Sequence, residues 1–154
     1  MDKMFTHVSG KGVGMVDISN KERTKRAAVA EGSIRLGPKT LSLIESDGIR
    51  KGNVLATAQL AGIMSAKRTS ELIPLCHQIP LDSIDLDLKI QKDGILATCR
   101  VVTTYGTGVE MEALMGVSQA LLTIWDMVKA VEKDEDGQYP STRIDDIRVI
   151  SKEK

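Results

Sequence analysis

The sequence contains few aromatic residues, few cysteines and no excess of either charge. Phe, Trp and Tyr together make up 3% of the chain, so a surface on which nucleic acid bases stack is not expected. The 21 Lys and Arg residues are balanced by 21 Asp and Glu residues, which gives no overall attraction to nucleic acid or to an anionic membrane. We therefore expect a protein that binds neither.

The sequence also lacks an apolar N-terminal segment of the secretion-signal type and any uninterrupted apolar run of membrane-spanning length. Its two cysteines, Cys76 and Cys99, form no CxxC pair and have no spacing typical of metal ligands. Reduced thiols of this kind are typical of cytoplasmic proteins. The motifs GxSxG and HExxH and the P-loop are absent as well. We expect a cytoplasmic location, no metal site and no resident cofactor.

A chain of 154 residues with 42% hydrophobic and 27% charged residues is large and apolar enough to form one globular domain with its own core. We expect a single domain over residues 1–154. Three glycines among polar residues indicate that residues 1–14 are a flexible lead-in. These glycines do not form a dinucleotide-binding motif, because no strand–turn–helix pattern surrounds them.

Alternation of apolar and polar residues predicts strands, and apolar residues three or four positions apart predict helices. Residues 27–36 fit both, since their alanines favour helix and their alternation favours strand; we prefer the strand. The predicted strands are residues 15–19, 27–36, 83–90, 95–104 and 142–150, and the predicted helices are residues 38–47, 53–73 and 107–130. A hairpin turn at residues 92–94 joins two of the strands. Together these elements predict an α+β fold, in which helices cover one face of an antiparallel sheet.

The longest predicted helix is apolar over most of its circumference. Asp126 lies nearly opposite its main apolar stripe and about 60° from Lys129. A helix that is apolar on both sides is expected to be buried on both, so we expect Asp126 and Lys129 to lie at a covered or half-covered surface. The alternative is an ordinary ion pair at an exposed helix end. The stripe consists of Leu114, Val117, Leu121, Ile124, Val128 and Val131.

Three other cations are candidates for binding an anionic ligand. Lys51 precedes Asn53, the expected N-cap of a helix, where free backbone N–H groups attract phosphate. Lys67 lies further along the same helix, and Arg26 ends a basic cluster. For each of the three, the alternative is a surface cation without a ligand.

His77 follows Cys76 in a loop bracketed by two prolines. A histidine held in this way is a candidate ligand or proton donor, and equally a loop residue that makes only a structural hydrogen bond. We do not expect it to bind zinc, because the further ligands are missing. Together with Glu112, Asp126 and the lysines, His77 makes a set of side chains that suits proton transfer on a polyanionic small molecule.

Longer motifs carry a more specific signal. They are LIPLCH at residues 72–77, TGVEMEAL at 107–114 and LTIWDMVKA at 122–130, with residues 15–19, 51–55 and 61–67 matching in the same order. This set resembles the signature segments of the cyclic pyranopterin monophosphate synthases, the C-protein family of molybdenum cofactor biosynthesis. The resemblance covers roughly residues 7–133. It implies a ferredoxin-like α+β fold and a homohexamer, a trimer of dimers, with sites at the subunit interfaces.

The resemblance also implies a reaction, in which (8S)-3′,8-cyclo-7,8-dihydroguanosine 5′-triphosphate becomes cyclic pyranopterin monophosphate and pyrophosphate is released. It implies that Asp126, Lys129 and Lys51 are catalytic. The substrate-binding residues that it implies are Leu75, Cys76, His77, Met111, Glu112, Lys67 and Arg26. The chain departs from the family at its C-terminus, where Lys152 lies in a tail without the family's Gly-Gly-Lys-Ser-Gly segment.

The competing hypothesis is a non-catalytic, oligomeric module that binds a nucleotide or phosphate through the same cations. Asp126 discriminates between the two hypotheses, because a site that only binds anions gains nothing from a carboxylate beside its lysine. The cheapest discriminating observation is release of pyrophosphate from the cyclic nucleotide.

Overall fold

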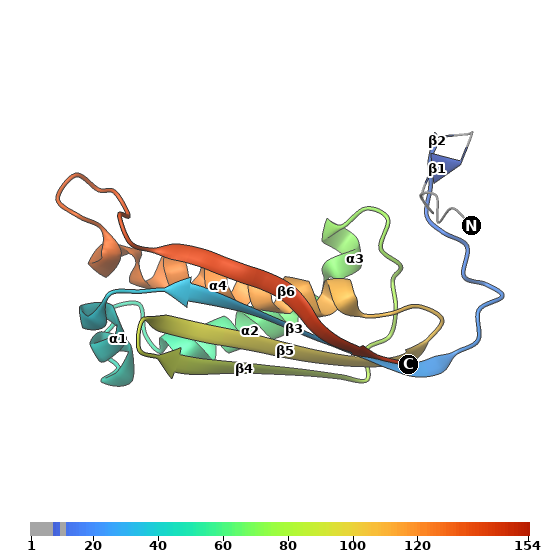
Figure 1. Ribbon diagram of the computed structural model, residues 1–154, viewed down its shortest axis with the longest axis horizontal. Coiled ribbons are helices and arrows are strands. Elements are labelled where there is room, and N and C mark those ends of the chain that lie inside the picture. The colour runs from blue at the N-terminus through green and yellow to red at the C-terminus, as the bar shows by residue number, and fades with distance from the viewer. Residues whose placement is uncertain (1–7, 10–11) are drawn as a thin grey trace.

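The computed structural model of the chain describes residues 8–9 and 12–154 (Figure 1). The strands of the main sheet are β3 (Thr24–Arg35), β4 (Ser83–Gln91), β5 (Gly94–Tyr105) and β6 (Arg143–Glu153). The helices are α1 (Pro38–Glu45), α2 (Val54–Lys67), α3 (Thr69–Leu72) and α4 (Glu110–Glu132). A separate two-stranded sheet pairs β1 (Val8–Ser9) with β2 (Gly12–Val13). The predicted lead-in falls largely on residues 1–7 and 10–11, which lie outside the described residues.

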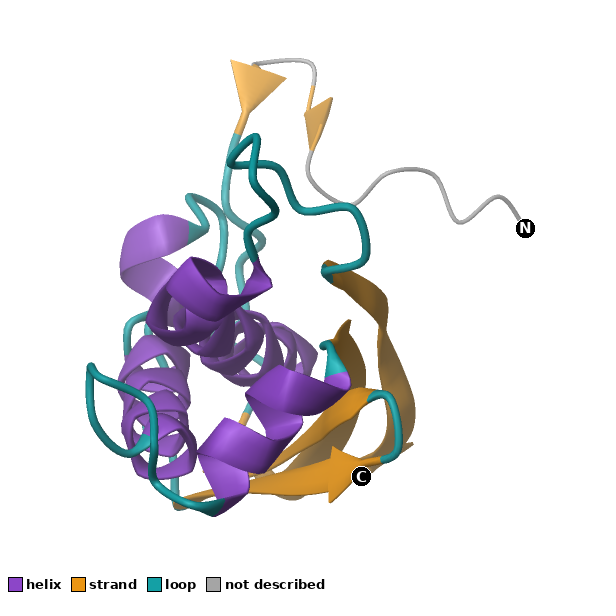
Figure 2. Ribbon diagram, turned by 90° about the vertical axis from the view of Figure 1, so that its left-hand side faces the viewer, coloured by secondary structure: helices purple, strands orange, loops and turns teal. Residues whose placement is uncertain are grey.

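The main sheet is antiparallel throughout and has the strand order β4-β5-β3-β6. Figures 1 and 2 show α2 and α4 lying along one of its faces. The predicted α+β fold, with helices on one face of an antiparallel sheet, is confirmed. When the helices between β3 and β4 are taken together, the elements follow one another as β-α-β-β-α-β, which is the order of ferredoxin-like motifs.

Alternation, and not alanine content, decides the structure of residues 27–36, most of which lie in β3. Ala28 and Ala30 face the helices and are at most 1% exposed. Small residues here let α4 approach the sheet closely, since a Cβ atom on Gly32 would lie 2.9 Å from the Cγ1 of Val117. The alanines therefore serve helix–sheet packing, and the preference for a strand is confirmed.

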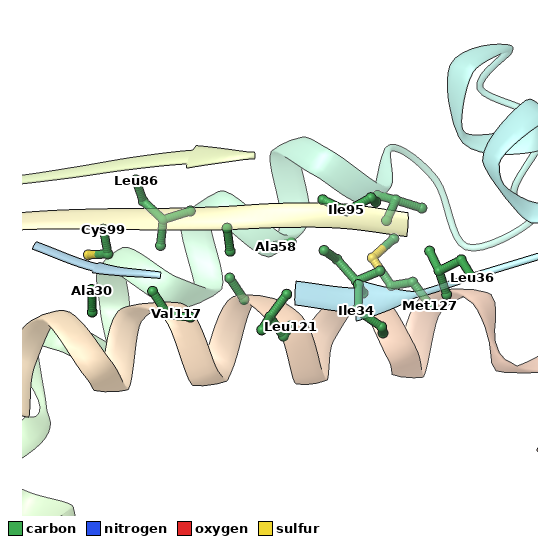
Figure 3. Close-up of a cluster of buried hydrophobic side chains, with 14 of the residues drawn as sticks. Ala30, Ile34, Leu36, Ala58, Leu86, Ile95, Cys99, Val117, Leu121 and Met127 are labelled. Carbon is green, nitrogen blue, oxygen red and sulfur yellow. The ribbon is translucent and has the colours of Figure 1, made fainter. Parts of the chain in front are cut away.

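The apolar stripe of α4 packs into the core that Figure 3 shows. Four of its predicted residues are completely buried, and burial of each such side chain stabilises the fold by roughly 1.5–3 kcal/mol. α4 is long and apolar enough to cross a membrane by composition alone, a test that core helices of soluble proteins also pass. Here the stripe packs on β3 and β5. The four buried residues are Val117, Leu121, Ile124 and Val128.

The strand predicted over residues 15–19 is wrong, because this segment is a loop. The carboxylate of Asp17 accepts a hydrogen bond from the N–H of Ser19 at 2.8 Å. The N–H of Lys21 donates to the carbonyl oxygen of Ile18 at 3.0 Å. These local hydrogen bonds turn the chain and compete with the pairing that a strand requires.

The helix predicted over residues 53–73 is also wrong in its extent, because the structure contains two helices there. α2 ends at Lys67 and α3 begins at Thr69. Arg68 between them has φ −104° and ψ 11°, which lies outside helical geometry. The hydroxyl of Thr69 donates to the carbonyl of Ala66 at 2.9 Å, in the last turn of α2. A side chain that bonds to the preceding turn in this way competes with continuation of the helix.

Candidate active site

Asp126 lies between two lysines on the outer face of α4. Its Oδ2 accepts a hydrogen bond from the Nζ of Lys51 at 2.9 Å, and its Oδ1 lies 2.9 Å from the Nζ of Lys129. The Nζ of Lys51 also donates to the backbone carbonyl of Asp126 at 2.8 Å. One chain therefore brings together the three residues that the family resemblance marks as catalytic, with one ammonium group on each carboxylate oxygen.

The loop between α1 and α2, residues 46–53, carries Lys51 to this position. Asn53 fixes the end of the loop: its Oδ1 accepts from the N–H of Ala56 at 2.8 Å and caps α2, as predicted. Its Nδ2 donates to Oδ1 of Asp47 at 3.0 Å. Asp47 has a positive φ of 53°, which turns the chain after α1. The turn and the cap together set the direction in which Lys51 leaves the loop.

The two lysines keep Asp126 ionised to a lower pH than usual. The hydrogen bond from Lys51, followed by the one from Lys129, lowers the pKa of the Asp126 carboxyl from the ordinary value of 3.8 to about 2. Asp126 in turn raises the pKa of Lys129 above its ordinary value. At neutral pH the cluster therefore holds one carboxylate and ammonium groups. Such a cluster can donate protons and bind anions through its lysines, whereas Asp126 has no proton to donate.

The prediction that Asp126 and Lys129 lie at a covered or half-covered surface is wrong for Asp126, which is exposed in the single chain, whereas Lys129 is half-buried. Their side chains are 58% and 44% exposed, and that of Lys51 is 47% exposed. The same face of α4 carries the apolar residue Leu122, as predicted. Leu122 is 54% exposed, so this face is not covered within the single chain. An apolar helix face is expected to be covered, but its composition does not show whether the same chain or another molecule covers it.

A second group of candidate residues lines a cavity of about 290 Å³ at the N-terminal end of α4. The walls of the cavity come from the loop after α3, from the first turn of α4 and from residues 16–21. The cavity brings together five of the residues expected to bind substrate, namely Leu75, Cys76, His77, Met111 and Glu112. The other lining residues are Val16, Ile18, Lys21, Thr107, Gly108 and Glu110.

His77 is held by the segment that precedes β3. Its Nε2 lies 2.6 Å from the carbonyl oxygen of Val16, and because a carbonyl oxygen only accepts, this contact assigns a proton to Nε2. The other ring nitrogen is then left for a different partner. The sequence analysis did not predict Val16, Ile18 or Lys21 as site residues. The only signal for Val16 and Ile18 is that residues 15–19 belong to one of the matching segments, whereas Lys21 belongs to the basic cluster that ends at Arg26.

Burial changes the acid–base properties of the cavity. Glu112 is 5% exposed, and desolvation raises the pKa of its carboxyl, to which the charge of Glu110 adds. Desolvation, followed by the charge of Glu112, also raises the pKa of the Cys76 thiol. Desolvation opposes ionisation of Glu110 as well. The hydrogen bond from Lys152, a backbone hydrogen bond and the charges of Lys152 and Arg26 outweigh it and lower the pKa of that carboxyl. The cavity thus holds one carboxyl that keeps its proton to a higher pH than usual and one that ionises readily.

The other two cations implied by the resemblance are placed differently. The Nε of Arg26 donates to the carbonyl of Tyr105 at 3.1 Å, and Arg26 is near enough to Glu110 of the cavity wall to lower its pKa. Lys67 is the exposed last residue of α2. The chain therefore places Arg26 near Glu110 of the cavity wall, and neither Arg26 nor Lys67 is among the lining residues.

α4 separates the cavity from the lysine–aspartate cluster. Glu112 lies in its first turn, and Asp126 lies 14 positions further along. At about 1.5 Å per residue, this spacing corresponds to roughly 21 Å along the helix axis. The cavity and the lysine–aspartate cluster therefore lie far apart along α4 within one chain.

Comparison with known proteins identifies one family. A model of the MoaC family matches residues 15–154. A probable cyclic pyranopterin monophosphate synthase of Thermococcus onnurineus is 60% identical over 152 residues, 99% of this chain and 97% of that protein. The protein of the same description from Pyrococcus abyssi is 62% identical over 150 residues, 97% and 94% of the two chains. That from Thermococcus kodakarensis is 60% identical over 152 residues, 99% and 97%.

Proposed function

Because the chain belongs to the MoaC family, we propose that it acts as a cyclic pyranopterin monophosphate synthase in molybdenum cofactor biosynthesis. The enzyme is a lyase with a nucleotide substrate. Its reaction converts (8S)-3′,8-cyclo-7,8-dihydroguanosine 5′-triphosphate to cyclic pyranopterin monophosphate and releases pyrophosphate. We place the enzyme in the cytoplasm, in keeping with its two free cysteines.

The observation that carries this proposal is the Asp126 carboxylate with an ammonium group on each oxygen. A hydroxyl of the substrate forms a new P–O bond to the α-phosphorus and loses its proton, which closes the cyclic monophosphate, while the P–O bond to the departing pyrophosphate breaks. Nearby cations stabilise the charge on the leaving group. We assign proton donation to Lys129, whose ammonium Asp126 orients from the same helix face. We assign to Lys51 charge neutralisation or proton transfer. A module that only binds phosphate would gain from the two lysines but not from the carboxylate between them.

We further propose that the cavity at the start of α4 holds the ring system of the substrate. Leu75, Cys76 and His77 form one wall, and Met111 and Glu112 form another. Glu112 supports this proposal, because a buried carboxyl with a raised pKa can donate a hydrogen bond to a ring nitrogen or carbonyl. Of the remaining cations, we assign phosphate binding to Arg26 and Lys67.

The cavity and the lysine–aspartate cluster form one site, in this proposal, across the interface between two copies of the chain in a homohexamer built as a trimer of dimers. The roughly 21 Å between Glu112 and Asp126 along one helix supports a shared site. The outward faces of α2 and α4 support an assembly: Leu60, Met64 and Leu122 remain 60%, 48% and 54% exposed on adjacent helices. Apolar side chains gathered in this way mark interaction surfaces.

Release of pyrophosphate from the cyclic nucleotide tests the proposed function. We expect the purified protein to release one pyrophosphate for each pterin product. We expect Asp126→Ala to keep its fold, its oligomeric state and its affinity for the nucleotide. It should release pyrophosphate about 10²–10⁴-fold more slowly, because Lys129 loses the carboxylate that orients it and loss of an acid–base function usually costs this much. If the wild-type protein binds the nucleotide and releases no pyrophosphate, the chain is a binding module and not an enzyme.

A further inference from the structure

The carboxylate of Glu132, the last residue of α4, joins three segments of the chain. Its Oε1 accepts hydrogen bonds from the N–H of Gly37, at 3.0 Å, and from the hydroxyl of Thr40. Its Oε2 accepts from the hydroxyl of Thr142. Both threonines are buried, with 1% and 6% exposure. Unpaired polar groups at such positions are costly, so these hydrogen bonds hold the three segments firmly to the end of α4.

Two of these contacts fix the start of α1. Gly37 is the N-cap of this helix and has no side chain with which to accept from the free N–H groups of the first turn. Glu132 accepts from the N–H of Gly37 itself, from 95 positions away in the sequence, and from the hydroxyl of Thr40 in the first turn. The third contact holds Thr142, the residue before β6. The end of α4 is therefore anchored to α1 and to the start of the last strand by a single side chain.

This anchor lies close in the fold to the lysine–aspartate cluster. Glu132 follows Lys129 by three positions and Asp126 by six, so the three residues lie within two turns of α4. α1 leads directly into the loop 46–53, which presents Lys51. Lys51 has to reach both the carboxylate and the backbone carbonyl of Asp126 within hydrogen-bonding distance. The placement of α1 relative to α4 therefore governs that contact.

We propose that Glu132 is a positioning residue of this site, which holds α1 against the last turn of α4 and thereby fixes Lys51 on Asp126. The inference rests on the proposed catalytic role of Lys51, Asp126 and Lys129. Glu132 takes no part in proton transfer itself, since both of its oxygens are engaged by Gly37, Thr40 and Thr142.

Two substitutions of Glu132 separate the effect of its hydrogen bonds from the effect of its charge. In Glu132→Gln, the amide oxygen still accepts from Gly37 and Thr40. The amide nitrogen donates to the Thr142 hydroxyl, which accepts as well as it donates. Glu132→Leu has a similar shape and removes all three hydrogen bonds. We therefore expect Glu132→Gln to preserve the site and Glu132→Leu to disturb it.

The test combines kinetics with crystal structures of the variants. For Glu132→Leu we expect kcat of pyrophosphate release to fall about 10- to 100-fold, because small misplacements of reacting groups have effects of this size. We expect KM to change by less than about threefold. We expect Glu132→Gln to retain most of the wild-type kcat. Glu135→Ala, which removes an exposed carboxylate three residues further on, is the matched control and should be unchanged. In the crystal structure of Glu132→Leu, Lys51 should have left Asp126.

A folded Glu132→Leu protein with wild-type kcat, or with the Lys51–Asp126 contact intact, overturns the proposal. If Glu132→Leu does not fold, Thr40→Val and Thr142→Val each remove one contact and decide the question: a smaller fall in kcat supports the proposal, and unchanged kcat overturns it. The crystal structures also separate this inference from the proposed function. If the wild-type protein releases no pyrophosphate, the position of Lys51 in the Glu132 variants still shows whether Glu132 fixes it.

Discussion

The Nζ of Lys51 lies 2.9 Å from Oδ2 of Asp126, although 75 positions separate the two residues in the sequence. Lys129 is only three positions from Asp126 and reaches Oδ1 from the same face of α4. Helix geometry thus places one lysine, and tertiary structure places the other. The contact of Lys51 with Asp126 therefore depends on how α1 and α2 are held against α4, whereas the contact of Lys129 depends only on the geometry of α4.

Lys129→Ala is expected to lower kcat of pyrophosphate release about 10²–10⁴-fold, because it removes the assigned proton donor. Lys129→Arg keeps a positive charge beside Asp126, but a guanidinium does not release a proton in the physiological range. We therefore expect the arginine variant to be almost as inactive as the alanine variant. Steady-state kinetics of both decide the matter. Near wild-type kcat in Lys129→Arg would mean that Lys129 supplies charge and no proton.

Lys51→Ala is expected to lower the rate even when substrate is saturating, because Lys51 also holds the side chain and the carbonyl of Asp126. Single-turnover measurements with excess enzyme give the rate of the bound substrate directly. Arg50→Ala is the matched control, since Arg50 is an exposed cation next in sequence. If saturation restores the full single-turnover rate of Lys51→Ala, Lys51 only binds the substrate.

The pH dependence of stability should reveal the buried thiol of Cys99. Cys99 is completely buried, and desolvation, followed by the charge of Asp85, raises the pKa of its thiol from 9.0 to about 12. Between pH 9.0 and about 12, the Cys99 thiol ionises in the unfolded chain and stays protonated in the folded chain. The unfolded state then binds fewer protons, so stability falls as pH rises, with a limiting slope of about 1.4 kcal/mol per pH unit.

Denaturant unfolding of the wild type and of Cys99→Ala at pH values from about 8 to 11 measures this effect. Alanine has no thiol to ionise, so the difference in unfolding free energy between the two proteins should shrink as pH rises. Lysines titrate in the same range in both proteins and cancel in the difference. Parallel curves for the two proteins would contradict the raised pKa.

Most of the fold could be predicted because its elements repeat a pattern over many residues. α4 has an apolar stripe that extends over five turns, and β3 alternates over most of its length. The errors occur where a single side chain decides. Asp17 bonds to the N–H of Ser19 and turns a segment that alternates like a strand, and Thr69 bonds to the turn before it and ends α2 early. Such contacts involve one residue and leave no periodic signal.

The candidate site could be predicted only in part, for a related reason. Its residue types and their motifs identify Asp126 and Lys129, but the exposure of this pair depends on what covers α4, which periodicity does not reveal. The sequence pattern predicts none of the long-range contacts of the candidate site. Val16 reaches His77 across 61 positions, and Glu132 reaches Gly37 across 95. The groups involved are a backbone carbonyl, which every residue carries, and a backbone N–H, which every residue except proline carries. Nothing in the sequence marks these backbone groups as partners.

A site shared between two chains is expected to recover activity when two inactive variants are mixed. The variants are His77→Ala, which alters the cavity, and Asp126→Ala, which alters the lysine–aspartate cluster. In a mixed dimer, one of the two sites combines the intact His77 of one chain with the intact Asp126 of the other. With free exchange, half of the dimers are mixed and each has one good site, so about a quarter of the wild-type activity should return.

Exchange is measured separately, with two affinity tags of different kinds on the two variants. A mixture of Asp126→Ala with Lys129→Ala is the matched control: both substitutions lie in the same cluster, every cluster in a mixed dimer is broken, and activity should stay absent. If tagged mixed dimers form and the His77→Ala and Asp126→Ala mixture stays inactive, the two residues serve sites within their own chains. The roughly 21 Å between Glu112 and Asp126 along α4 would then have to be spanned by the substrate itself, with its triphosphate at one end and its ring system at the other.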